Sequence, residues 1–229
     1  LAKKISEEIP HSHDQAAGVD ALQIHRLQEQ KTASVMKRIL HVIHGLNVGG
    51  AETFIYNILR NIDSSEYHFD FAIQNPEIGH KAFKKLIEEK GGKIYIITDF
   101  RRNILKQYRE LSSILKSGYD YVHIHMNAFV NPVPAVVASK FPGKVIIHSH
   151  NTHNGSGGTP ARLLHLLNRR LCMKKDFIRL ACGTDAGKWM FRGKDFTVVN
   201  NAVDLDRFRY NVEASRNIRR KYGLTDELV

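Results

Sequence analysis

Residues 38–53 have the sequence RILHVIHGLNVGGAET, which predicts a buried strand, a glycine-rich turn and the beginning of a helix. The first part is apolar and rich in β-branched residues, as buried strands are. Gly45, Gly49 and Gly50 then permit positive φ angles and the close approach of another backbone or of a phosphate. From Ala51 onward, apolar residues recur at helical spacing.

A helix that begins beside a glycine turn directs free backbone N–H groups and a partial positive charge at that turn. Such a helix end suits an anion, for example a diphosphate. A glycine motif alone is a weak signal. The alternative therefore stays open that these glycines serve only to make a tight connection from strand to helix.

Composition limits the kinds of protein that this chain can be. Of its 229 residues, 42% are hydrophobic and 25% charged, which is typical of a globular protein. Cys172 and Cys182 fit a reducing compartment without a disulfide framework. No apolar run reaches the length of about 18 residues that a membrane span needs, and the N-terminus lacks the apolar segment of a secretory signal. These features predict a cytoplasmic protein.

The net charge of +11, from 34 Lys and Arg against 23 Asp and Glu, favours an anionic partner. Nucleic acid, an acidic membrane surface and phosphorylated ligands are the three classes to consider. We find no basic run interleaved with stacking aromatic residues and no known nucleic-acid-binding module, so nucleic acid is not expected.

Residues 1–35 differ from the rest of the chain. They are polar and show only a weak helical pattern, whereas Met36 looks like a natural protein start. We expect residues 1–35 to be an extension outside the fold, with an ordered helical arm as the alternative.

After residue 53, strand and helix patterns alternate with short connections. This alternation predicts an α/β fold, a Rossmann-like parallel sheet with helices on both faces. In such sheets, ligands bind beyond the carboxyl ends of the strands. The expected strands are 38–43, 68–74, 93–98, 120–125, 144–150, 176–182 and 195–201, and the expected helices begin at 51, 79, 103, 131, 161 and 183.

Two H-x-H patterns end neighbouring strands, at His123 and His125 and again at His148 and His150. Residues two apart share one face of a strand. H-x-H is a known zinc spacing, but no Asp or Glu stands nearby to complete or orient such a set, so no metal is expected. Two interpretations remain: histidines that face solvent or are satisfied within the core, and imidazoles that bind sugar hydroxyls or phosphate oxygens.

Five segments in order resemble the N-terminal half of GT-B glycosyltransferases. The closest resemblance is to the retaining family 4 enzymes of bacterial capsule and exopolysaccharide assembly. It extends from about residue 37 to residue 229. The segments are HVIHGLNVGGAET (41–53), VHIHMN (122–127), IIHSHNT (146–152), ACGTDAGKWMF (181–191) and VVNNAVDLDRF (198–208).

The resemblance implies two Rossmann-like domains that face each other across a cleft, the first for the acceptor and the second for a nucleotide sugar. It makes residues 36–203 the acceptor-binding domain and residues 204–229 a hinge and the start of a donor domain. Ala202 replaces the glycine that is usual in the hinge motif. The implied roles are donor diphosphate binding for Gly49 and Gly50, catalytic contact with the transferred sugar for His125, acceptor and sugar binding for Asn127, His150, Asn151 and Thr152, and the hinge for Asn200, Asn201 and Asp204.

The implied reaction is the transfer of a hexose from a nucleotide sugar to a hydroxyl of a lipid-linked or saccharide acceptor, with retention at the anomeric carbon. It implies no cofactor and no metal, with the nucleotide sugar as co-substrate. The family's acidic motif and its phosphate-binding Arg/Lys pair would lie beyond Val229, so the chain alone is expected to be inactive. One alternative is a non-catalytic, membrane-docking subunit that lends an acceptor site to a separate chain. A nucleotide-sugar 2-epimerase is another, but it would need acidic and histidine catalytic residues that are not seen in the expected places.

The expected helix at 161–175 has leucines on one side and basic residues beside them. Each Lys or Arg near an anionic membrane adds about 1 kcal/mol of attraction, so this helix could dock weakly on such a surface. Lys81, Lys84 and Lys85 could belong to the same surface. The alternative is an ordinary core-packed helix with a solvated basic face. The leucines are Leu163, Leu164, Leu167 and Leu171, and the basic residues are Arg162, Arg169, Arg170, Lys174 and Lys175.

Overall fold

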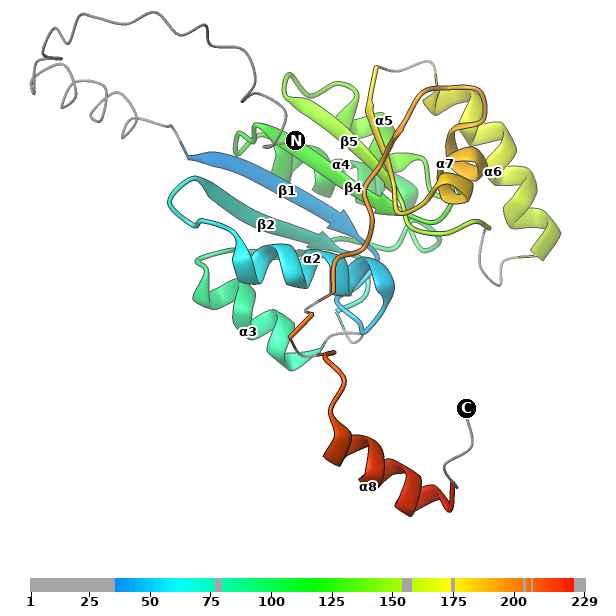
Figure 1. The fold of residues 1–229 in the computed structure, drawn as a ribbon. Helices are drawn as coiled ribbons and strands as arrows, with labels where there is room; N and C mark the ends of the chain where they lie inside the picture. The colour runs from blue at the N-terminus through cyan, green and yellow to red at the C-terminus, as the bar shows by residue number, and fades with distance from the viewer. Residues whose placement is uncertain are drawn as a thin grey trace, which may run out of the picture. The chain divides into compact units, whose positions relative to one another are not determined.

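A parallel β-sheet forms the centre of the unit Met36–Val229 (Figure 1). The computed structural model describes residues 36–76, 80–153, 158–173, 176–203, 205–206 and 208–224. The seven strands are β1 (Lys37–Ile43), β2 (Tyr67–Ile73), β3 (Ile94–Ile96), β4 (Tyr121–Met126), β5 (Lys144–Ser149), β6 (Ile178–Ala181) and β7 (Thr197–Val198).

The strand order is β3-β2-β1-β4-β5-β6-β7, with every neighbouring pair parallel. The chain therefore first builds the sheet outward from β1 in one direction and then crosses over to continue from β4 in the other. In this doubly wound topology the crevice at the reversal point, between β1 and β4, is the usual ligand site. The predicted Rossmann-like α/β fold is confirmed.

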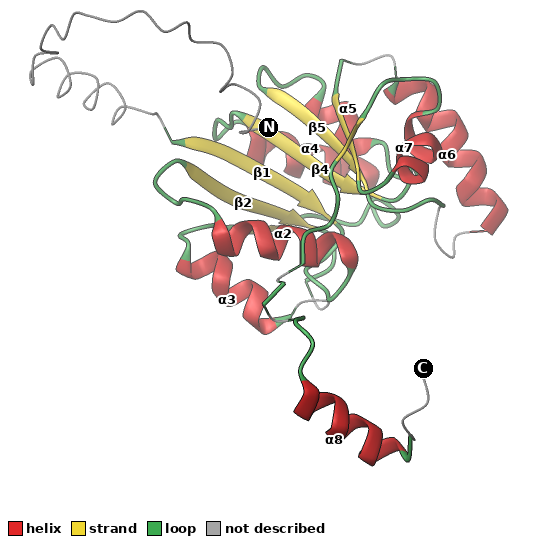
Figure 2. Cartoon of the chain, in the orientation of Figure 1, coloured by secondary structure: helices red, strands yellow, loops and turns green. Residues whose placement is uncertain are grey.

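Two hydrophobic layers cover the two faces of the sheet (Figure 2). One layer joins β1 and β2 to α2 (Gly50–Asn61) and α3 (Lys81–Glu89), through residues such as Phe54, Phe71 and Ile87. The other layer joins Leu40 and Ile147 to α4 (Ile104–Leu115), α5 (Val133–Ala138), α6 (Gly158–Cys172) and α7 (Thr184–Phe191). Because side chains alternate along a strand, one run of residues supplies both layers.

Local signals set several helix ends. Asn103 accepts a hydrogen bond from the backbone N–H of Lys106 at 2.9 Å and so caps the start of α4. Gly91 and Gly118 follow α3 and α4 with φ angles of +75° and +76°, a conformation that strongly favours glycine. These two glycines therefore end the helices that precede them.

Gly49 does not use the freedom that the sequence suggested for it. Its φ of −118° and ψ of 176° are extended and open to any residue. What distinguishes the position is a close approach, because a Cβ atom there would meet the carboxylate of Glu52. Of the two possibilities that the sequence allowed at Gly49, the close approach is therefore used and the positive φ is not.

The element boundaries differ from expectation mainly near the C-terminus. A helix that the sequence analysis did not predict, α8 (Val212–Tyr222), follows the sheet. Asn211 caps its start by accepting from the N–H of Ala214 at 2.9 Å, and Gly223 ends it with a φ of +63°. None of its residues is buried. Local capping therefore defines α8, whereas core packing defines the other helices.

Some earlier expectations fall outside the described residues. These concern residues 1–35, Asp204, Lys174 and Lys175. Among the residues that are described, no helix combines the length and apolar character needed to cross a bilayer.

Candidate functional site

Five imidazoles lie together on one face of the three central strands. They come from β1 (His41), β4 (His123 and His125) and β5 with the residue after it (His148 and His150). His41 pairs with His123 and His125 with His148 in the parallel register, so these side chains point to the same side of the sheet. We call these five residues the histidine cluster.

Hydrogen bonds link the cluster. The Nδ1 atom of His41 lies 3.0 Å from Nε2 of His125, and Nδ1 of His125 lies 2.9 Å from Nε2 of His150. A second pair joins Nε2 of His123 to Nδ1 of His148 at 3.3 Å. Both ring nitrogens of His125 are thus engaged by other imidazoles.

The cluster is uncharged at neutral pH. Burial lowers the pKa of His41 to about 3, and burial followed by the neighbouring His148 lowers the pKa of His150 to about 3. Burial also lowers the pKa of His148 to about 4 and holds the pKa values of His123 and His125 well below their ordinary range. Neutral imidazoles can each donate one hydrogen bond and accept another, as the chain from His41 to His150 requires.

The ring of Phe54 on α2 packs against the histidine cluster. Its ring meets His148 edge-on, with centroids 5.0 Å apart, and lies 5.9 Å from the ring of His150. The same helix begins at the glycine turn. One element therefore both covers the histidines and presents its N-terminus to the carboxyl edge of the sheet.

A pocket of about 640 Å³ opens at this edge, and we call it the histidine pocket. It brings together six of the residues that the sequence placed in the site. These are Gly49, Gly50, His125, Asn127, His150 and Asn151. Segments far apart in the chain thus share one hollow, as expected from the carboxyl ends of neighbouring parallel strands.

The N-terminus of α2 contributes backbone donors to the histidine pocket. Gly49 is the N-cap of α2 and has no side chain that could accept from the first N–H groups of the helix. Glu52 and Arg101 also line the pocket and bring one charge of each sign. A bound anion would be attracted by Arg101 and by the helix end, and would have to displace the Glu52 carboxylate from its place over Gly49.

Thr152, Asn200 and Asn201 are not among the residues that line the histidine pocket. Thr152 is exposed, and its N–H donates to Oδ1 of Asn151 at 2.8 Å. Asn200 and Asn201 are also exposed. The hinge segment nevertheless lies against α2, because Nδ2 of Asn57 donates to the Ala202 carbonyl at 3.0 Å.

Sequence reasoning missed three residues of this region: His41, Glu52 and Arg101. Arg101 follows the carboxyl end of β3, and its place after a strand in a basic dipeptide was an available signal. Glu52 lies in the first turn of the helix that the sequence predicts, and this position was an available signal. The place of His41 in the site could not be inferred from spacing along the chain, because 84 residues separate it from its partner His125.

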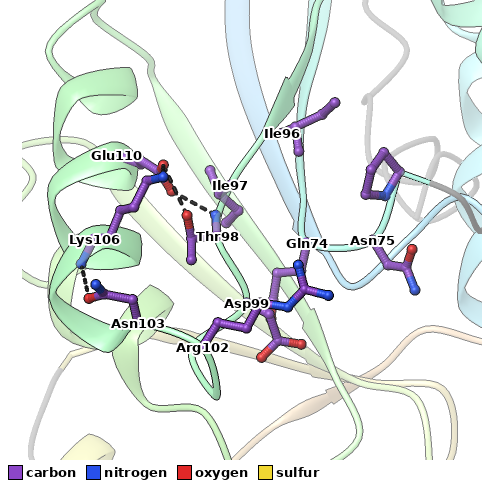
Figure 3. A pocket seen from close by; sticks show the side chains of 11 residues that line it. Gln74, Asn75, Ile96, Ile97, Thr98, Asp99, Arg102, Asn103, Lys106 and Glu110 are labelled. Carbon is purple, nitrogen blue, oxygen red and sulfur yellow. Dashed lines mark hydrogen bonds and ion pairs between the residues drawn. The ribbon is translucent and has the colours of Figure 1, made fainter.

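A second pocket, of about 710 Å³, lies beyond β2 and β3 and against α4 (Figure 3). Gln74 lines both pockets, so the two adjoin. Arg102, Lys106 and Asp99 give the second pocket a charged wall, and we call it the Arg102 pocket. Glu110 is held in place there by the N–H and hydroxyl of Thr98, at 2.6 and 3.0 Å.

Helix α6 turns its leucines outward. The exposed fractions of Leu163, Leu167 and Leu171 are 57%, 57% and 50%, and only His165 and Cys172 of this helix are buried. Of the two interpretations left open for this helix, the one in which the leucine row packs in the core is therefore contradicted. Cys172 is 2% exposed and belongs to the hydrophobic core.

The sequence matches no family model. It is 29% identical over 206 residues to the protein named "Putative glycosyltransferase EpsF" of Bacillus subtilis (strain 168), and the match covers 86% of this chain and 53% of that protein. The chain thus has a glycosyltransferase-like sequence and spans about half the length of the curated relative that it matches.

Two solved structures share the fold. One is titled "putative UDP-N-acetylglucosamine 2-epimerase" from Listeria monocytogenes, with a TM-score of 0.52, 12% identity, and coverage of 80% of this chain and 52% of that one. The other is the S. aureus MnaA–UDP co-structure, with a TM-score of 0.51, 14% identity, and coverage of 82% and 50%. The likeness concerns the fold alone: the Rossmann-like sheet of this chain matches part of each GT-B-like neighbour.

Proposed function

We propose that this chain supplies one half of a glycosyltransferase that moves a sugar from a nucleotide sugar to a hydroxyl acceptor. The observation that carries the proposal is the histidine pocket, where the glycine turn at the start of α2 meets His125 and His150. The sequence similarity to EpsF supports the reaction class, and the UDP bound to the fold neighbour MnaA supports a nucleotide ligand.

In this proposal the N–H groups at Gly49 and Gly50 stabilise the negative charge that grows on the departing diphosphate. Donors fixed in place before the reaction cost no reorganisation when that charge develops, and one such donor is worth about 100-fold in rate. Arg101 adds a positive charge at the same wall. The transfer retains the anomeric configuration, as in family 4 enzymes of capsule or exopolysaccharide assembly, and needs no divalent ion.

The acceptor lies along Asn127, His150, Asn151 and Thr152, and the adjoining Arg102 pocket offers cationic groups to an acceptor that carries phosphate, such as a lipid-linked one. Asn200, Asn201 and Asp204 serve as the hinge to a donor domain. Because the chain spans 53% of its relative, the activity is proposed for a protein that also contains the remaining part, and the 229-residue chain alone is inactive in this proposal.

The test uses the complete protein that contains this chain. It is incubated with a panel of nucleotide sugars and a lipid-linked or saccharide acceptor, and release of the nucleotide diphosphate is measured together with the anomeric configuration of the product. We expect a retained configuration and turnover that needs no added Mg²⁺ or Mn²⁺. A product with inverted configuration, or turnover that stops in EDTA and returns with Mg²⁺, would contradict the mechanism.

An alternative is that the chain is a non-catalytic, membrane-docking subunit of the cytoplasm that lends an acceptor site to a separate donor-binding chain. The outward leucines of α6, flanked by Arg162, Arg169 and Arg170, are the observation that favours membrane docking. The downstream gene sequence separates the two proposals. An in-frame second Rossmann-like domain supports the enzyme, and a stop codon with a separate partner gene supports the subunit.

A further inference from the structure

We propose that His125, His148 and His150 form a binding site for a transition-metal ion that prefers imidazole ligands, of which Zn²⁺ is the main candidate. This inference shares His125 and His150 with the transferase proposal but is separate from it: the ion would be held by the protein and would not take part in the transfer, which needs no divalent ion. It rests on the side-chain cluster alone, because one ring nitrogen from each of the three residues lies within 4.8 Å of the other two.

The separations are close to those of a metal site. Zn–N bonds of about 2.0–2.1 Å in a tetrahedral site place neighbouring ligand atoms about 3.3 Å apart. Nδ1 of His125 and Nε2 of His150 are already 2.9 Å apart, and His148 offers a ring nitrogen within 4.8 Å of one ring nitrogen of each. Imidazole nitrogen is a ligand suited to Zn²⁺, Ni²⁺ and Cu²⁺ and poorly suited to Mg²⁺.

The surrounding hydrogen bonds also resemble those around metal-bound histidines. A metal-ligating histidine almost always engages its other ring nitrogen with an orienting partner. If His125 binds through Nδ1, its Nε2 keeps the 3.0 Å contact with His41. If His148 binds through Nε2, its Nδ1 keeps the 3.3 Å contact with His123.

A metal site would explain one feature of the histidine cluster, an unpaired nitrogen of His148. Nε2 of His148 is buried and has no hydrogen-bond partner. A buried polar atom without a partner costs about 1–3 kcal/mol. A bond from this atom to a metal ion would remove that cost. Since His125 and His150 also line the histidine pocket, a fourth ligand can arrive from the pocket side.

The test uses the tag-free 229-residue chain with Co²⁺ and Zn²⁺ as probes. His11 and His13, in the segment outside the described residues, are changed to alanine so that they cannot bind the metal. We expect one equivalent of Co²⁺ to bind with the visible absorption of a four-coordinate site and to be displaced by Zn²⁺. If the H11A/H13A chain does not bind one equivalent of Co²⁺, the proposal is overturned.

The matched variants are His150→Gln and His153→Gln. His153 is exposed three residues further along and bonds to Asn151, outside the cluster. We expect His150→Gln to weaken Co²⁺ binding on the order of 100-fold and His153→Gln to leave it unchanged. His150→Cys should keep binding and add a thiolate charge-transfer band, which only a direct ligand can produce. Circular dichroism of each variant establishes that it is folded, and wild-type affinity in folded His150→Gln overturns the site.

Discussion

The Nδ1 atom of His125 lies 2.9 Å from the Nε2 atom of His150, while the opposite nitrogen of His125 contacts His41 at 3.0 Å. His125 therefore holds its neighbour's ring in place and has no ring nitrogen without a partner. In the proposed transferase, His125 would act on a ligand in two ways. Its own ring lines the pocket, and its hydrogen bond fixes the orientation of the His150 ring.

We expect His125→Ala to lower kcat of the complete protein by about 100-fold, since loss of a positioned group in a polar site costs about that much. The measurement is steady-state turnover, with Tm as the check on folding. His153→Ala is the matched control and should keep normal turnover. Near-normal activity of His125→Ala would remove this residue from the site.

Asp70 should be important for stability. It is fully buried and accepts hydrogen bonds from the hydroxyl of Tyr119 and the N–H of Lys93, both at 2.8 Å, and it lies 3.3 Å from Arg38. Burial, followed by this hydrogen bond, raises the pKa of Tyr119 above its ordinary value. Asp70→Ala would leave these donors without their acceptor and should lower the free energy of unfolding by about 3 kcal/mol.

Urea denaturation checks the Asp70 prediction. Asp185→Ala is the control, because Asp185 is exposed and its ion pair with Lys188 spans 3.8 Å. We expect that change to stay within about 0.5 kcal/mol of wild type. If the two substitutions lower the free energy of unfolding equally, the hydrogen bonds of buried Asp70 add no more stability than the exposed ion pair of Asp185.

His165 should make stability depend on pH. It is fully buried, its Nδ1 accepts from the N–H of Phe129 at 3.0 Å, and its ring stacks on Trp189 with centroids 4.3 Å apart. Burial, and then the positive charge of Arg169, lowers its pKa to about 4. The unfolded chain binds this proton below about pH 6.5 and the folded chain does not, so stability is full above that pH and falls as pH drops toward 4.

The full difference between the two pKa values corresponds to about 3 kcal/mol. The comparison is between wild type and His165→Gln, whose other histidines are identical. We expect the difference in their free energies of unfolding to shrink as pH falls from 7 to 4. A constant difference across this range would contradict the account of His165.

Leu167→Gln should weaken binding to vesicles of anionic lipid about tenfold, because full burial of a leucine side chain is worth about 1.5 kcal/mol or more. Leu105→Gln on α4 is the matched control, since Leu105 is 65% exposed and Leu167 57% exposed. Binding should also weaken as salt rises. Equal binding to neutral vesicles, or equal loss with both variants, would argue against docking through α6.

Sequence alone was sufficient for the sheet and for the helices that pack on it, because their apolar periodicity is a direct consequence of burial. It did not predict α8, which has no buried face and depends on Asn211 and Gly223 at its ends. Those capping residues are present in the sequence, but capping residues alone do not define a helix.

The site could be predicted only in part, for a geometrical reason. Glycines and histidines at strand ends indicate the correct edge of the sheet, and His125, His150 and Gly49 do line one pocket. The contact of His41 with His125 depends on strand order and register, which spacing along the chain does not give. The outward direction of Leu167 likewise depends on which face of α6 meets the sheet.

The placement of β1 beside β4 has a consequence for synthesis of the protein. His41 leaves the ribosome before its neighbours His123 and His125, which follow 82 and 84 residues later. Contacts so distant in sequence close slowly. Until they close, the apolar edge of β1 has no partner on that side, and the nascent chain must keep β1 from associating with other strands.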